Sequence, residues 1–213
     1  MSSVIVMTEG LHDVEFLRVL HRTGTDRRKY DTFISRETND TQETRIQQHR
    51  VDDDIRWLYK AEGGRSKLIK KFRSNVLQFG NDNLTLIVMI DLDHEGYDSF
   101  ESELNEKLNE YFGGQIRVDS RDSESNAHLQ IHDCVVRKGD EPAYQFDLVA
   151  FHDDLEAVTG IDEDDEEGGD DNGGDNSDNG EEDGWNRAKH RRKIRYYLTH
   201  CPDVCADVRG TVL

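Results

Sequence analysis

Four carboxylate side chains stand where their spacing could support metal-assisted chemistry. Glu9 directly follows the apolar run V-I-V-M-T, and three more acids follow a second apolar run in the string D-L-D-H-E-G. Alternation along an extended chain would turn Asp91, Asp93 and Glu95 the same way. Carboxylates brought close together repel one another unless one is protonated or a cation lies between them. Hard oxygen ligands suit Mg²⁺, with Mn²⁺ as a substitute, so the four acids form a candidate metal site.

The two apolar runs that precede these acids are predicted to be buried strands. Residues 4–7 are mostly β-branched and end at a T-E-G turn, and residues 84–90 form the most apolar run in the chain. In an open α/β sheet, functional groups gather beyond the carboxyl ends of the strands. An acid after one strand is usually a loop residue or a helix cap. Two buried strands that both end in acids favour a shared site.

The remaining pattern predicts helices and strands in alternation. Apolar residues recur at helical spacing over 14–20, 65–79 and 100–112, while the stretch 37–62 is polar and ambiguous, with helical spacing in Ile55, Leu58 and Tyr59. This order predicts a three-layer α/β domain with a mainly parallel central sheet flanked by helices. Further strands are expected at 31–36, 115–119, 128–137 and 144–151, and a basic helix at 185–200.

The net charge of −19 is concentrated in one segment. Residues 162–184 hold 13 acids and no Lys or Arg, which leaves a net charge of −6 on the rest of the chain. A segment with so few apolar residues buries too little apolar surface to offset the chain entropy lost on folding. We therefore expect a disordered acidic linker over 161–184. It separates a main domain over 1–160 from a basic helical segment over 185–213. Scarce Lys among many acids indicates a halophilic source; the alternative is an ordinary acidic protein with an interaction tail.

The cysteines and the hydropathy pattern bear on where the protein works. Cys134, Cys201 and Cys205 form a sparse, odd-numbered set that suits a reducing cytoplasm rather than a disulfide framework. His200 beside Cys201 lacks a second Cys/His pair to complete a zinc site. No apolar run approaches the length of about 18 residues that a membrane-spanning helix needs, and no basic region precedes the first apolar run. We therefore expect a cytoplasmic protein with no membrane contact.

Together, the two acidic motifs resemble the topoisomerase–primase, or Toprim, domain. The resemblance rests on V-I-V-M-T-E-G-x-x-D, which contains Glu9, Gly10 and Asp13, and on I-V-M-I-D-L-D-H-E-G. It spans about residues 3–112, half of the chain, and 37–62 looks inserted between the motifs. Type IA and type II topoisomerases, bacterial-type primases, small maturation nucleases and nucleases of the overcoming-lysogenization-defect family share this domain.

The resemblance implies roles for individual residues in a Rossmann-like Toprim catalytic domain with its core at 3–112. Glu9 would act as general acid or base, and Asp91 and Asp93 would hold Mg²⁺, helped by the acid that follows them. In the overcoming-lysogenization-defect family a second acidic motif approaches the metals. In this chain Asp154 or Glu156, in the string H-D-D-L-E, would supply it.

A double glycine marks a candidate phosphate site. Gly63 and Gly64 open the helix that is predicted to begin at Arg65, and a helix N-terminus offers backbone N–H groups and a favourable dipole to an anion. Lys67 adds a positive charge. The segment is not a Walker loop, since G-x-x-x-x-G-K-[ST] is absent, but it resembles the Gly-Gly-Lys-type turn of the same nuclease family. A plain helix start with surface bases is the alternative.

Two clusters of basic residues could bind nucleic acid. One lies on the helix after the double glycine, and the other lies on the last predicted helix, near Trp185, Tyr196 and Tyr197. Where basic side chains alternate with aromatic ones, the basic groups can contact phosphates and the aromatic rings can stack on nucleobases. Pairing with the neighbouring acidic stretch is the alternative. The clusters are Arg65, Lys67, Lys70, Lys71 and Arg73, and Arg187, Lys189, Arg191, Arg192, Lys193 and Arg195.

We therefore expect a Mg²⁺-dependent Toprim-type enzyme that acts on phosphodiester bonds of nucleic acid, most simply a nuclease. At 213 residues the chain is too short for a topoisomerase, and it carries no primase zinc module. A non-catalytic Toprim-like module, whose separately encoded ATPase partner carries the activity, is the alternative. A haloacid-dehalogenase-type phosphatase also places D-x-D after a strand, but Glu95 stands where that family has Thr or Val.

Overall fold

The computed structural model describes residues 3–23, 29–34, 55–81, 84–92, 95–155, 159 and 187–212, and the elements below belong to these residues. The strands are β1 Ser3–Thr8, β2 Lys29–Ile34, β3 Ile55–Ala61, β4 Leu84–Asp91, β5 Ile116–Ser125, β6 Leu129–Lys138 and β7 Glu141–Phe151. The helices are α1 Leu11–Thr23, α3 Arg65–Asn81, α4 Tyr97–Phe112, α6 Arg187–His200 and α7 Pro202–Val212. The predicted linker at 161–184 lies outside the described residues.

The strands form one mixed sheet in the order β2-β3-β1-β4-β7-β6-β5. From β2 to β7 every neighbouring pair is parallel, and only the β7–β6 and β6–β5 pairs are antiparallel. Parallel neighbours place their carboxyl ends at the same edge of the sheet. The prediction of an α/β fold with a mostly parallel sheet flanked by helices is confirmed.

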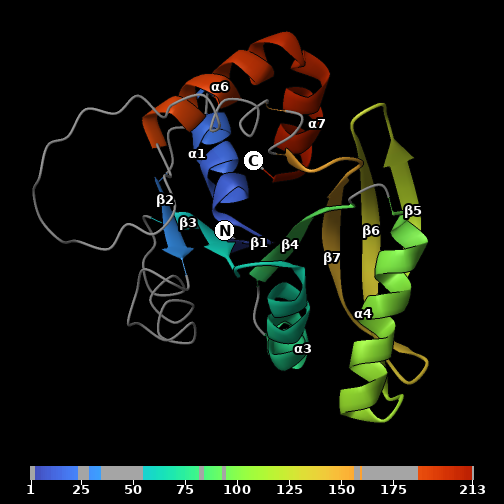
Figure 1. The fold of residues 1–213 in the computed structure, drawn as a ribbon. Helices are drawn as coiled ribbons and strands as arrows, with labels where there is room; N and C mark the ends of the chain where they lie inside the picture. The colour runs from blue at the N-terminus through green and yellow to red at the C-terminus, as the bar shows by residue number, and fades with distance from the viewer. Residues whose placement is uncertain are drawn as a thin grey trace, which may run out of the picture.

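Helices cover both faces of this sheet (Figure 1). Val4, Val6 and Trp57 point to the face covered by α1, α6 and α7, and they share a core with apolar residues of those helices. Ile5 and Met7 point to the other face and pack with apolar residues of α3 and α4. This alternation follows from the two-residue period of a strand, so both faces of β1 are buried and its residues 4–7 are all apolar.

The strand β3 corrects the sequence interpretation of 37–62. Ile55, Leu58 and Tyr59 share helical spacing, yet Ile55–Ala61 is a strand that pairs with β1 on one side and β2 on the other. Lys60, fully buried near the end of this run, breaks the apolar pattern that would have identified a buried strand. The rest of that stretch, 35–54, lies outside the described residues.

The C-terminal helices pack onto the same core as α1. Ile194, Val204 and Val208 are fully buried there, and the indole N–H of Trp57 donates to the carbonyl of Val212 over 2.9 Å. The sequence pattern predicted a basic helix over 185–200 within a helical segment over 185–213, and it did not separate α7, in which Gly210 and only a few buried apolar residues weaken the helical signal. None of the helices in the described residues is long and apolar enough to cross a membrane.

We expect Ile194→Ala to lower the free energy of unfolding by about 2–5 kcal/mol, because it leaves a cavity between α6 and α1. Tyr196→Ala, at a side chain 68% exposed on the same helix, should change it by less than about 0.5 kcal/mol. Urea denaturation followed by circular dichroism measures both. If both variants changed the free energy of unfolding by the same small amount, α6 would not contribute to the folded core.

Candidate functional site

Acidic residues stand at the carboxyl ends of three neighbouring strands. Glu62 follows β3, Glu9 follows β1, and Asp91 is the last residue of β4. These strands are adjacent in the order β3-β1-β4, and Thr8 is in register with both Ala61 and Met89. The parallel register therefore brings the three acids to one edge of the sheet.

Two of the predicted site residues, Glu9 and Asp91, are in direct contact. The backbone N–H of Asp91 donates to Oε1 of Glu9 over 3.4 Å, and both residues are partly buried. The side chain that ends β1 thus reaches across to the backbone that ends β4. This contact orients the Glu9 carboxylate at the centre of the carboxyl edge.

The other two predicted ligands differ from this pair. Asp93 lies outside the described residues. Glu95 has an exposed side chain, and its Oε2 lies 3.3 Å from Nη2 of Arg65. In the described part of the chain, no three His, Cys, Asp or Glu side chains form a group that could hold a metal ion.

The second acidic motif, H-D-D-L-E, begins where β7 ends. Asp154 stands three residues after Phe151, and Phe151 is in register with Asp91 of the parallel neighbour β4. Asp154 therefore belongs to the same edge of the sheet as Asp91, and its side chain is partly buried. Glu156 lies outside the described residues.

The double glycine binds the protein's own backbone. Gly63 and Gly64 have φ angles of +85° and +112°, which favour glycine, and both N–H groups donate to the carbonyl of Glu9, over 2.8 and 2.7 Å. Both donors are therefore used within the protein, contrary to the expectation that they face a phosphate. At the start of α3 the N–H groups of Arg65 and Ser66 have no partner within the helix, as helix geometry requires. A phosphate site here would use these N–H groups.

The side chains around this turn are also arranged by internal contacts. Nε of Arg65 lies 3.2 Å from Oε2 of Glu103, and its guanidinium lies 5.2 Å from the centre of the Phe100 ring. Together with Glu95, these contacts hold Arg65 against α4. Lys67 is exposed, and a Cβ on Gly63 would lie only 3.4 Å from its Nζ. Lys67 is thus the base of this turn that solvent can reach.

Glu62 is a candidate site residue that sequence reasoning missed. Its Oε1 lies 2.5 Å from Nζ of Lys60, and neither side chain has any exposed surface. Burial lowers the pKa of Lys60, and the neighbouring Glu62 partly offsets this shift. The string A-E-G-G repeats the acid-glycine pattern of T-E-G at 8–10. That signal was overlooked because the preceding residues were not identified as a strand.

The predicted basic clusters are only partly available to a partner. On α6, Nε of Arg191 is paired with the buried Glu15 of α1, and this hydrogen bond raises the pKa of Arg191. Arg192 and Arg195 are exposed beside Tyr196. Side chains at 187–190 lie outside the described residues.

The cluster on α3 presents several bases to solvent. Lys67, Lys70 and Lys71 are exposed, and Arg73 lies 4.6 Å from the centre of the ring of Tyr111, which is itself 59% exposed. Bases beside an accessible aromatic ring suit a nucleic-acid backbone. These side chains lie on the helix that begins at the double glycine.

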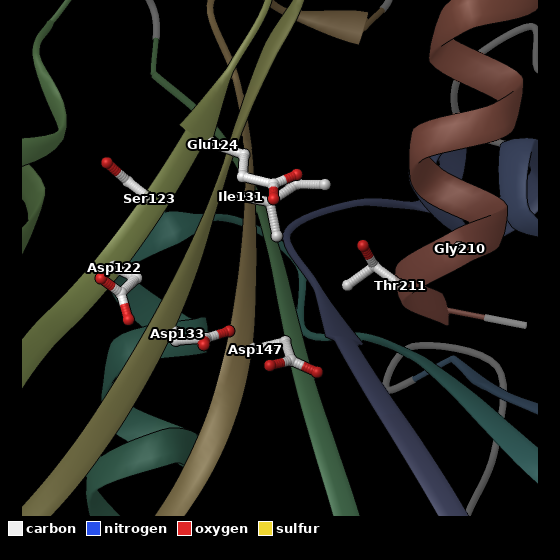
Figure 2. Close-up of a pocket in the computed structure, with 8 residues that line it drawn as sticks. All are labelled: Asp122, Ser123, Glu124, Ile131, Asp133, Asp147, Gly210 and Thr211. Atoms are coloured by element: carbon white, nitrogen blue, oxygen red, sulfur yellow. The ribbon is translucent and has the colours of Figure 1, made fainter.

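A separate acidic pocket lies beside the last turn of α7 (Figure 2). Its volume is about 310 Å³, and none of the predicted site residues lines it. Asp133 on β6 is in register with Asp122 on one side and Asp147 on the other. Burial, and then the charge of Asp133, raises the pKa of Asp147. The lining residues are Asp122, Ser123, Glu124, Ile131, Asp133, Asp147, Gly210 and Thr211.

No protein-family model matches the chain, and no curated protein is significantly similar to it.

We expect Asp147→Asn to raise the free energy of unfolding at pH 7 by roughly 0.2–1 kcal/mol, because like charges directly opposite on neighbouring strands are destabilising. The raised pKa means that the folded protein binds this proton more tightly than the unfolded chain does. Wild-type stability therefore falls as the pH rises through the raised value, and the gain from the variant disappears below the ordinary aspartate pKa. Urea denaturation at pH 7 and near pH 3.5 measures both effects.

Asp119→Asn is the matched control with the opposite sign. Asp119 accepts a 2.6 Å hydrogen bond from Nε of Arg137, so its replacement should lower stability at pH 7. A loss of stability in Asp147→Asn at pH 7 would contradict the repulsion between Asp133 and Asp147.

Proposed function

We propose that this chain is a Toprim-type enzyme that uses a divalent cation, Mg²⁺ or Mn²⁺, to cleave phosphodiester bonds in nucleic acid. The observation that carries the proposal is the contact of Glu9 with the backbone of Asp91 at the carboxyl ends of β1 and β4. The parallel central strands β3-β1-β4, with helices on both faces, support a Rossmann-like arrangement of the Toprim kind.

The described residues at this edge fit a hard divalent cation. Mg²⁺ is commonly held by one or two carboxylates and keeps several waters, and Glu9 and Asp91 supply two carboxylates. At the same edge, Oε2 of Glu62 is a buried acceptor with no hydrogen-bond partner in the described part of the chain. Such an atom fits a site in which a cation or its water completes the polar contacts. Asp93, outside the described residues, would be a further ligand.

The residues of this edge have distinct roles in the proposed reaction. Bound there, a divalent cation neutralises charge on the scissile phosphate and makes a water molecule more acidic. Asp91 and Glu9 would hold the cation, and the Glu9 carboxylate would also accept the proton of the attacking water. The N–H of Asp91 orients Oε1 of Glu9 for that task, and Gly63 and Gly64 fix its backbone.

The substrate would approach along α3. Exposed Lys67, Lys70 and Lys71 lie on the helix that begins at the carboxyl edge, so a phosphate backbone placed along them reaches Glu9 and Asp91. Neutralising phosphates releases counterions, which makes such binding strongly salt-dependent.

One contact favours the alternative of a non-catalytic module. Glu95 pairs with Arg65, so a predicted ligand and a predicted phosphate-binding base engage each other. In that alternative the chain binds nucleic acid and a separately encoded ATPase subunit carries the activity. Cation binding without cleavage of DNA or RNA would favour it.

We expect Glu9→Gln and Asp91→Asn each to reduce cleavage of labelled nucleic acid at least about 100-fold, because each removes a proton acceptor or a ligand. The assay uses single- and double-stranded DNA and RNA with Mg²⁺ or Mn²⁺, and EDTA should abolish cleavage. Asp147→Asn, at an acid outside the site, should cleave at the wild-type rate. Full activity in both site variants would refute the assignment.

A second prediction concerns the α3 surface. We expect combined Lys67→Gln, Lys70→Gln and Lys71→Gln to weaken nucleic-acid binding, because fewer phosphates are neutralised. The slope of log affinity against log salt should fall by about 0.7–0.9 for each phosphate that the variant no longer neutralises. Fluorescence anisotropy between about 50 and 200 mM salt measures this slope. Replacing Lys107, at the far end of α4, is the control. An unchanged slope in the triple variant would exclude α3 as the binding surface.

A further inference from the structure

Glu62 occupies the third strand end of the candidate site. Thr8 and Ala61 are in register, and the N–H of Glu62 donates to the carbonyl of Thr8 over 3.0 Å. Glu62 therefore lies across from Glu9, at the normal spacing between strands of about 4.8 Å. Met7 and Leu58 share the core on the α3 side, and Glu9 and Glu62 follow them at even spacings just beyond the ends of β1 and β3.

Lys60 holds only one side of the Glu62 carboxylate. Nζ of Lys60 lies 2.5 Å from Oε1, and both side chains are fully buried. Replacing such a buried ion pair by apolar residues of similar volume is often neutral or stabilising, so stability alone gives no reason for its presence. A role in the neighbouring site would account for the pair where stability does not.

The second oxygen of Glu62 lacks a partner among the described residues. Oε2 is buried and accepts no hydrogen bond from any of them, and Glu62 as a whole is only 2% exposed. An acceptor in this position needs a donor, and a carboxylate excludes anions such as phosphate. Glu9 and Asp91 at the neighbouring strand ends make the same edge attractive to cations. A water molecule polarised by a divalent cation is a strong hydrogen-bond donor, and its positive hydrogen is attracted to a carboxylate oxygen.

We propose that Glu62 is a positioning residue of the cation site: Lys60 holds its Oε1, and its Oε2 accepts a hydrogen bond from the hydration water of the divalent cation. This inference rests on the proposed function, because it assumes that Glu9 and Asp91 hold that cation. Glu62 is not a direct ligand. It adds the carboxyl end of β3 to a site that β1 and β4 supply, and it raises cation affinity through oriented water.

The test compares two double variants of the full chain, one with an amide at position 62 that offers an acceptor oxygen and one with an apolar side chain there. Lys60→Met with Glu62→Leu removes the buried charges and the acceptor, whereas Lys60→Met with Glu62→Gln removes the charges and keeps an acceptor oxygen. Mn²⁺ alone is the probe, and electron paramagnetic resonance of free Mn²⁺ gives the affinity without any activity assay. Glu110→Gln, which removes a Lys-paired acid from an exposed position on α4, is the control.

We expect the Met/Leu variant to bind Mn²⁺ about 10–100-fold more weakly than the wild type, while its thermal unfolding midpoint without Mn²⁺ stays near the wild-type value. The Met/Gln variant should bind roughly tenfold more tightly than the Met/Leu variant, as expected for one hydrogen bond to a polarised donor. Glu110→Gln should bind Mn²⁺ as the wild type does. If the double variants fail to fold, Glu62→Gln alone, with Lys60 retained, must still weaken Mn²⁺ binding.

Two negative results have different meanings. Wild-type Mn²⁺ affinity in both folded double variants, together with abolished binding in Glu9→Gln or Asp91→Asn, would overturn the role of Glu62 and leave the proposed function intact. Equal Mn²⁺ affinity in the Met/Gln and Met/Leu variants would also overturn the role of Glu62. Absence of Mn²⁺ binding in the wild type would instead overturn the proposed function, and the role of Glu62 with it.

Discussion

The clamp of the Glu9 carbonyl by two glycine N–H groups is the interaction on which the geometry of the carboxyl edge depends. The N–H groups of Gly63 and Gly64 converge on one oxygen, which requires successive positive φ angles that residues with a Cβ rarely adopt. The clamp joins the end of β3 to the end of β1. The backbone of Glu9 is thereby fixed from one side of β1, while its side chain contacts Asp91 on the other side. One residue thus connects three strands.

Three ion pairs of the described residues involve buried or partly buried charge, and two of them join elements far apart in sequence. Lys60 meets Glu62 within β3 and the turn after it, Arg65 joins the start of α3 to α4, and Arg191 joins α6 to Glu15 of α1. A buried carboxylate without such a partner would be costly, because its desolvation would not be offset. The pairs therefore specify how the helices dock, and apolar packing supplies most of the stability.

Sequence patterns predicted the elements whose buried residues form an apolar pattern that is visible within the element itself. β1 and β4 are apolar on both faces, and α4 has a clear apolar stripe that ends at Gly113, in the left-handed conformation. β3 was not predicted, because Lys60 is acceptable in a core strand only when Glu62 pairs with it. Glu62 was missed for the same reason. That the glycine N–H groups bind Glu9 could not be inferred, since the contact joins residues more than fifty positions apart.

The net charge of −19 says little about the electrostatic surroundings of an individual site. Salt screens charges beyond about 8 Å at physiological ionic strength, so the neighbours of a group matter more than the total. Exposed lysines lie on α3, on one face of the sheet, and Arg191 meets α1 one turn after its start, on the other face. Bases thus lie on both sides of the edge where Glu9 and Asp91 meet. The row Asp122, Asp133 and Asp147 is placed differently, since none of these acids forms an ion pair with a described residue. The same residue type therefore belongs to a candidate cation site in one place and is a source of repulsion in another, and the partners that the fold supplies decide which.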